Sequence, residues 1–243
     1  MRFINSVLFL LLCTSGCTLL TEKNNLSIDS SELLTPNNLS RYYDVSGRIL
    51  FKHPDGDNSG DLLMQISRRS EMRLRIYAPI VGSLIYELRV GSENFLVLNY
   101  QDKNFVLDEN DLEVRQKWLG MDLSLDEIRW LVVGKLPEKI KPWKRKKLPT
   151  GEWQLTKNKY EILIRYNSEG YIESMNKSGE GLLEYKAKIP QYQKEKEAIY
   201  PKKIQIEDYT GNNIWVIYIN EIHSIPGSMK SLEFDPPKYL QPL

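Results

Sequence analysis

The chain has little of what most catalytic or metal-binding sites require. Its 243 residues include two histidines, His53 and His223, and two cysteines. No Gly-x-Ser-x-Gly, His-Glu-x-x-His or phosphate-loop pattern occurs. The formal charge of +1 also supplies no general field that would draw the chain onto nucleic acid. We therefore predict a protein that is not an enzyme, that holds no metal or cofactor, and that binds no nucleic acid.

Both cysteines lie near the N-terminus, in a segment with the layout of a bacterial lipoprotein signal. Arg2 supplies a positive charge, residues 7–12 are apolar, and residues 14–16 (Thr-Ser-Gly) are small and directly precede Cys17. The apolar run is too short for a spanning helix. We predict that residues 1–16 are a signal peptide and that Cys17 carries a covalent lipid. The alternative is an ordinary secretory signal in which Cys17 lies by chance.

The signal constrains the rest of the chain. The mature protein would have no cysteine other than Cys17, so disulfides are excluded and the core alone must stabilise the fold. No second apolar run approaches about 18 residues, so we expect no segment to span a membrane. Residues 17–41 combine Ser, Asn, Thr and Pro with scattered leucines, which predicts a flexible tether with a span of roughly 30 Å.

From residue 42 onward, apolar and polar residues alternate with a period of two. This pattern is typical of antiparallel strands with one buried face. We expect strands at 45–51, 62–66, 72–76, 84–90, 95–100 with a continuation near 105–107, 153–155, 160–166, 170–176, 181–189, 203–207 and 214–222. We estimate about ten or eleven strands in total, which suits one large, strongly curved antiparallel sheet with helices covering its open side.

A helical insert separates two groups of strands. Ser124 and Glu127 fit a capping box, apolar residues then recur at helical spacing, and Gly134 fits the helix end. Residues 110–119 give a weaker helix signal. We therefore expect a mainly β fold with one or two helices between its halves.

Two surface segments carry unusual residues. In the turn at residues 78–83, Ile80 and Val81 lie where polar residues are expected. They either fold back onto the core or form an apolar protrusion for a lipid or a partner. Residues 139–147 hold six basic side chains around Trp143. This stretch is either a solvated loop or a contact for anionic headgroups or an acidic partner protein.

Several short motifs occur in the order seen in the LolB family. They are residues 45–49 (Val-Ser-Gly-Arg-Ile), residues 74–83 with Ala-Pro-Ile-Val-Gly-Ser at their end, residues 129–137 (Arg-Trp-Leu-Val-Val-Gly-Lys-Leu-Pro), and the pair 200–208 and 214–222. The chain resembles LolB over residues 42–224. LolB is the outer-membrane lipoprotein that receives lipoproteins from the periplasmic carrier LolA.

The resemblance implies an unclosed, half β-barrel with a helical lid around an apolar cavity that holds acyl chains. It also implies a projecting loop with an exposed leucine that helps deliver cargo into the membrane. Here that loop is Pro79, Ile80, Val81 and Gly82, with no leucine. By the family's sorting habit, Thr18 after Cys17 favours a lipid-anchored, periplasm-facing location at the outer membrane. Residues 226–243, with four prolines, extend past the family's usual end as a tail.

These observations define the hypothesis. We expect a monomer that accepts acylated lipoproteins from a LolA-like carrier and inserts them into the outer membrane without catalysis. We expect residues 42–225 to form the half-barrel. From strand alternation, the predicted cavity lining is Met72, Leu74, Ile76, Leu84, Tyr86, Leu88, Ile162 and Ile164, with Trp130 on the lid. The same alternation could describe a filled core, so the alternative is a tethered structural or scaffolding lipoprotein. A hydrolase of envelope polymers is a third, more distant possibility.

Overall fold

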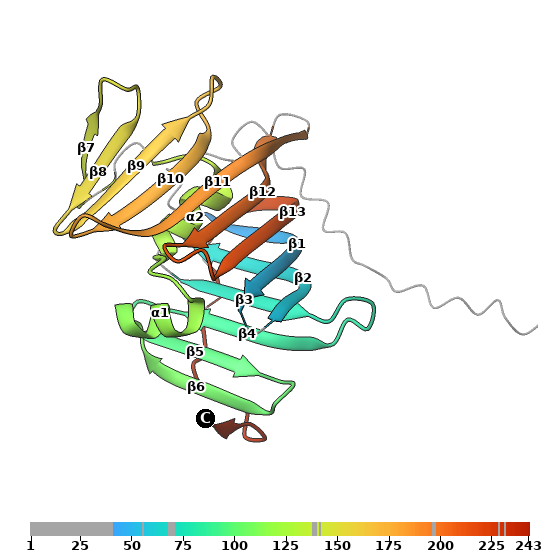
Figure 1. The fold of residues 1–243 in the computed structure, drawn as a ribbon. Coiled ribbons are helices and arrows are strands. Elements are labelled where there is room, and N and C mark those ends of the chain that lie inside the picture. The colour runs from blue at the N-terminus through green and yellow to red at the C-terminus, as the bar shows by residue number, and fades with distance from the viewer. Residues whose placement is uncertain are drawn as a thin grey trace, which may run out of the picture.

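The fold is one open β-sheet with two helices on its inner face (Figure 1). The computed structural model describes residues 41–54, 56–67, 71–137, 140, 142–195, 198–227, 229–230 and 232–243. Within these ranges the sheet has fourteen strands in the order β14-β6-β5-β4-β3-β2-β1-β13-β12-β11-β10-β9-β8-β7. All neighbours are antiparallel except β14 and β6. The expected single, unclosed, curved sheet is therefore confirmed.

The first half of the sheet is a meander from the sheet centre outward. Its strands are β1 (Arg41–His53), β2 (Gly56–Ser67), β3 (Met72–Tyr77), β4 (Leu84–Val90), β5 (Asn94–Asn99) and β6 (Asn104–Glu109). The second half follows the helices and returns to the centre. Its strands are β7 (Lys144–Lys147), β8 (Trp153–Lys157), β9 (Tyr160–Tyr166), β10 (Ile172–Gly179), β11 (Leu182–Glu195), β12 (Ala198–Asp208) and β13 (Ile214–Pro226), and β14 (Gln241–Pro242) ends the chain.

Fourteen strands in the described part of the chain exceed the ten or eleven that we expected. Strand β7 consists of four basic residues and has no alternation to detect. Strand β14 has two residues. It forms only because backbone groups of the C-terminal segment meet the outer edge of β6, where Leu243 N–H donates to Phe105 O over 3.0 Å. Neither strand has a periodic sequence signal.

The two helices begin and end as their sequences predict. Helix α1 (Leu112–Leu119) is capped by Asp111, and α2 (Leu125–Val133) has the predicted capping box. The Glu127 N–H donates to Ser124 Oγ, and Ser124 N–H donates to Glu127 Oε2 over 2.8 Å. Both helices end at glycines in the left-handed conformation, Gly120 and Gly134.

The first strand, β1, pairs with the late strand β13 in the middle of the sheet, from Arg41↔Pro226 to Lys52↔Ile214. We call this pairing the central seam. The register shifts at Gly47, where a Cβ atom would collide with the backbone oxygen of Tyr218. A glycine is therefore required at this position of the seam.

The main core fills the inner face of the sheet beneath α2. Ile162 and Ile164 of β9 are fully buried, and Trp130 of α2 is 1% exposed and packs edge-on to Trp143 with ring centroids 6.4 Å apart. The half of the inner face that carries β3 to β6 keeps an open apolar pocket. We call the half beneath α2 the filled half and the half with this pocket the hollow half.

The C-terminal segment crosses the outer face of the sheet. Leu240 packs with Leu96 and Leu98 of β5, and Phe234 joins this second, small cluster. Arg89 Nη1 donates to Glu233 O over 2.5 Å. Although we expected a tail outside the half-barrel, residues 232–243 pack against β4, β5 and β6.

A buried carboxylate lies beneath this C-terminal segment. Glu87 of β4 is 1% exposed and accepts hydrogen bonds from Arg73 Nε and Arg89 Nε, each over 2.7 Å, and from Tyr100 Oη over 3.3 Å. Burial alone would raise the pKa of Glu87, but the hydrogen bonds and charges of Arg89 and Arg73 lower it below its usual value. Burial and Glu87 together raise the pKa of Tyr100 to about 12.

Replacing this carboxylate should destabilise the protein in a pH-dependent way. Because the pKa of Glu87 is lowered by folding, its stabilisation is present above the ordinary pKa of a glutamate and is lost as pH falls through the folded value. We expect Glu87→Gln to lower the free energy of unfolding by ~2 kcal/mol at neutral pH, and the difference to shrink in acid. Urea unfolding of the wild type and the variant at neutral and at acidic pH measures this difference. The control is Glu93→Gln, at an exposed position. A pH-independent difference would contradict the role of the charge.

Candidate functional site: an apolar pocket and a projecting loop

An apolar pocket of about 320 Å³ lies on the hollow half of the inner face. Its walls come from β1, β3, β4, β5, β6, β13 and α1. The lining residues are Phe51, Leu74, Ile76, Tyr86, Glu87, Leu88, Val97, Asn99, Asp102, Asn104, Val106, Trp118, Leu119, Trp215 and Leu243. The volume lies near the lower end of the range of about 300–1,000 Å³ found for small-molecule sites.

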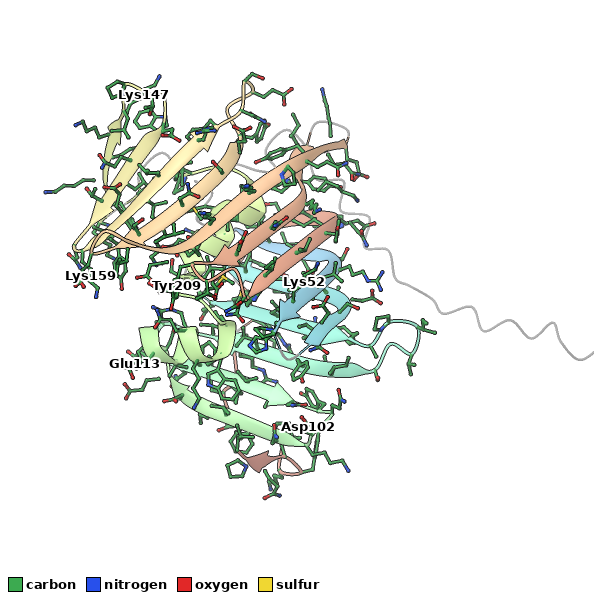
Figure 2. The ribbon with its side chains drawn as sticks, in the orientation of Figure 1. Lys52, Asp102, Glu113, Lys147, Lys159 and Tyr209 are labelled. Carbon is green, nitrogen blue, oxygen red and sulfur yellow. The ribbon has the colours of Figure 1, made fainter. Side chains whose placement is uncertain are left out.

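The pocket is apolar along its walls and polar at one end. Phe51 and Trp215 meet edge to face with ring centroids 5.2 Å apart, across the central seam. Asn99, Asp102 and Asn104 lie in or beside the turn between β5 and β6, where Asn99 Nδ2 donates to Asp102 Oδ2 over 2.8 Å. Figure 2 labels Asp102 at this end of the sheet. An apolar chain with a polar end group would match this distribution.

One donor in the pocket wall has no protein acceptor. The Nε1 of Trp118 is buried, and the described residues provide no hydrogen-bond partner for it. A buried N–H that stays unpaired costs about 1–3 kcal/mol. A carbonyl oxygen of a bound ligand could remove this cost.

The structure places the predicted lining residues in two groups. Leu74, Ile76, Tyr86 and Leu88 do line the pocket. The remaining predicted residues do not line it and are corrected here: Met72, Leu84, Trp130, Ile162 and Ile164. Alternation identifies the inner face of each strand, but it does not say where along that face a helix fills the space. Helix α2 fills it over β9, so Ile162, Ile164 and Trp130 are core residues.

Sequence reasoning missed several lining residues. Phe51 and Val97 belong to predicted strands and could have been found by extending the alternation across the sheet. Trp118 and Leu119 lie on α1, so the helix at the pocket is α1 and not α2. Leu243 carried no signal at all, because only the fold of the C-terminal segment brings it to the edge of β6.

The loop between β3 and β4 projects from the same half of the sheet (Figure 1). It is closed by Ala78 N–H to Ser83 O, over 2.8 Å, and Gly82 N–H to Ala78 O, over 3.0 Å. Ile80 is fully exposed, at 104%, and Val81 is 79% exposed. The two apolar side chains therefore do not fold back onto the core.

The backbone of this loop is strained. Ile80 has φ of 76°, a left-handed conformation that costs a β-branched residue about 1–2 kcal/mol. A glycine or asparagine would adopt it more easily. An exposed isoleucine held in this conformation is unfavourable both in solvation and in backbone energy, which points to a role outside folding.

Buried charges lie elsewhere, beneath α2. Lys177 Nζ of β10 is 2.8 Å from Asp122 Oδ2 and 3.3 Å from Glu127 Oε1, and these side chains are at most 4% exposed. Lys177 also donates to the backbone oxygen of Asp122 over 3.0 Å. Burial raises the pKa of Glu127, while Lys177 opposes the shift. The network therefore joins the α1–α2 connection and α2 to strand β10 of the sheet.

No group of three or more His, Cys, Asp or Glu side chains that could hold a metal occurs among the described residues. His223 is exposed beside Glu221. Over the same residues, no helix is both long and apolar enough to cross a bilayer. Cys17 lies outside the described residues, so its lipidation stays a prediction.

Comparison with solved structures supports the architecture. A LolA superfamily protein of Nitrosomonas europaea superposes with a TM-score of 0.54 and 13% identity, over 85% of this chain and 94% of that chain. An outer membrane lipoprotein-sorting protein domain of Vibrio parahaemolyticus superposes with a TM-score of 0.50 and 7% identity, over 78% of this chain and 87% of that chain. The chain has a LolA-like fold. No protein-family model matches the sequence, and no curated protein matches it.

Proposed function

We propose that this protein is a LolB-like outer-membrane lipoprotein that receives acylated lipoproteins from a LolA-like carrier and inserts them into the membrane. One observation carries the proposal. The β3–β4 hairpin supplies Leu74, Ile76, Tyr86 and Leu88 to the apolar pocket, and its turn presents the exposed Ile80 and Val81. A single hairpin thus connects a place that can hold an acyl chain with a tip that can meet a bilayer.

The chemistry of transfer needs no catalytic residue. An acyl chain entering an apolar site gains about 0.8 kcal/mol per buried methylene. The pocket can therefore take a chain from a weaker carrier site and release it to a bilayer that binds it more strongly. A lipid on Cys17 and a tether at residues 17–41 would keep the domain near its target membrane.

A second candidate is the tethered scaffold. The filled half of the sheet favours it, because Ile162, Ile164 and Trp130 form a solid core where a larger cavity was expected. A scaffold would not bind apolar ligands saturably. Ligand binding therefore separates the two candidates.

Filling the pocket should abolish binding of an apolar fluorescent probe. Val106 lines the pocket and is half-buried, whereas its neighbour Leu107 points to the opposite face and is 49% exposed. We expect a soluble form that begins after Cys17 to bind one probe saturably. We expect Val106→Trp to weaken binding by roughly tenfold or more, since the indole occupies the site.

The matched control is Leu107→Trp, which adds the same group outside the pocket and should bind the probe like the wild type. Thermal melting of both variants checks their folding. Equal binding by the wild type and Val106→Trp would move the ligand site elsewhere. No saturable binding by the wild type would favour the scaffold.

A further inference from the structure

Strand β7 forms a strongly basic edge at one end of the sheet. We define the basic edge as Lys144, Arg145, Lys146 and Lys147, all of which are exposed. Residues 135–159 contain nine basic and two acidic side chains, a formal charge of +7, although the whole chain has a formal charge of +1. The stretch around this strand is therefore strongly positive, whereas the rest of the chain has a formal charge of −6.

These cations are not neutralised within the protein. Over the described part of the chain, no carboxylate lies within ion-pair distance of the basic edge. Arg145 instead lies over the ring of Trp153, with Cζ 3.9 Å from the ring centroid. Stacking on an indole holds the guanidinium in place without consuming its hydrogen-bond donors.

The charges lie on both faces of the strand. Arg145 and Lys147 pair with Leu155 and Trp153, so they share the inner face with the fully buried Leu155. Lys144 and Lys146 therefore point to the outer face. On the inner side, Arg145, Lys147 and Lys135 surround a shallow groove of about 550 Å³ whose floor includes Trp153 and Tyr166.

The edge itself is unpaired within the described residues. Strand β7 ends the sheet order, and its one hydrogen-bonded neighbour there is β8. Its outward backbone groups are thus open to another strand. The edge is also far from the β3–β4 loop, since nine strands lie between β4 and β7 in the sheet order. Figure 2 shows Lys147 and Asp102 at opposite ends of the molecule.

We propose that the basic edge is a docking site for an extended acidic segment of another protein, which adds to β7 as a further strand. A lipid headgroup or free phosphate would contact one face, whereas the side chains of an added strand alternate between both faces. Acidic residues on that strand would meet Lys144 and Lys146 on one face and Arg145 and Lys147 on the other. Backbone hydrogen bonds and opposite-charge pairs across the strands would both contribute.

The test uses the full chain in non-ionic detergent and two fluorescent peptides of about ten residues. In one peptide, pairs of Glu alternate with pairs of Thr, so that Glu faces both sides of the added strand. In the other, Pro replaces every Thr, which keeps the same charge but removes donors of ladder hydrogen bonds. We expect the Glu-Thr peptide to bind saturably and more weakly as salt rises, and the Glu-Pro peptide to bind at least about tenfold more weakly.

A quadruple variant removes the four charges of the basic edge: Lys144→Gln, Arg145→Gln, Lys146→Gln, Lys147→Gln. It should bind the Glu-Thr peptide at least about tenfold more weakly than the wild type does. Its control is Lys52→Gln, Lys117→Gln, Lys186→Gln, Lys238→Gln, which removes the same charge from exposed positions elsewhere and should bind like the wild type. Equal losses in both variants would overturn the site in favour of a long-range field. Equal binding of the two peptides would overturn strand addition.

Two further outcomes would overturn the proposal. Binding of monomeric short-chain phosphatidylglycerol at the basic edge, with no binding of either peptide, would make the site a headgroup contact. The second outcome is self-association of the β7 variant in sedimentation, with no peptide binding by the wild type. The charges would then serve only to prevent sheet edges of two copies from pairing. Neither result bears on the pocket, which the apolar probe tests separately.

Discussion

The variant Ile80→Glu, Val81→Glu is expected to fold normally and to fail completely in lipoprotein transfer from carrier to membrane. Both side chains are exposed, and exposed positions contribute little to stability. Glutamate at position 80 would occupy the same left-handed backbone without a β-branch. Transfer should nevertheless stop, because placing two carboxylates among acyl chains costs several kcal/mol each.

A matched variant tests whether any exposed apolar pair would give this result. Leu182 and Tyr209 are 73% and 68% exposed and lie near each other, since Tyr209 N–H donates to Glu184 O. Leu182→Glu, Tyr209→Glu should melt and transfer like the wild type. Melting curves and an assay of lipoprotein release from the carrier into membranes provide the readout. Normal transfer by the Ile80 and Val81 variant would remove the loop from the mechanism.

The largest loss of stability is expected from Lys177→Met. The substitution leaves Glu127 buried without its cation and leaves Asp122 with Arg115 alone, whose Nη2 is 3.7 Å from Asp122 Oδ1. Removing one partner of a buried ion pair costs about 3–5 kcal/mol. The exposed pair Lys159 and Glu180 supplies the control. Lys159→Met should cost at most about 1 kcal/mol. Urea unfolding at neutral pH measures both.

The loss in Lys177→Met should depend on pH with a defined sign. Burial raises the pKa of Glu127, and Lys177 opposes that shift. Without Lys177 the folded pKa rises further, so the buried carboxylate destabilises the folded state increasingly as pH rises above its unfolded value. The variant should therefore recover stability as pH falls. Adding Glu127→Gln should restore part of the loss at neutral pH, and a loss that is equal in acid and at neutral pH would contradict this account.

The sequence predicted the elements of the fold well where one local rule decides them. The capping box at Ser124 and the glycine at 134 define α2 without any knowledge of the sheet. Alternation likewise located Met72, Leu74 and Ile76 on the inner face. The pairing of β1 with β13 could not be predicted this way, because no local pattern specifies a partner so far along the chain.

The candidate site was less predictable than the fold. Leu74 and Ile162 have the same strand pattern and burial, yet one lines the pocket and the other packs under a helix. The difference depends on where α1 and α2 dock, and docking is a property of the whole inner face. The contribution of Leu243 depends on a C-terminal segment with little periodicity. The turn residues Ile80 and Val81 stood out because they broke a local rule.

The central seam sets the order in which the molecule can fold. Strands β2 to β6 and strands β8 to β12 pair with near neighbours, so each meander closes short loops. The seam joins Tyr42 to Ile225, and closing such a long loop has a high entropic cost before any contact offsets it. We therefore infer that each meander forms before β1 pairs with β13, and that this pairing limits the folding rate. A substitution at Gly47 should therefore slow refolding more than one within either meander.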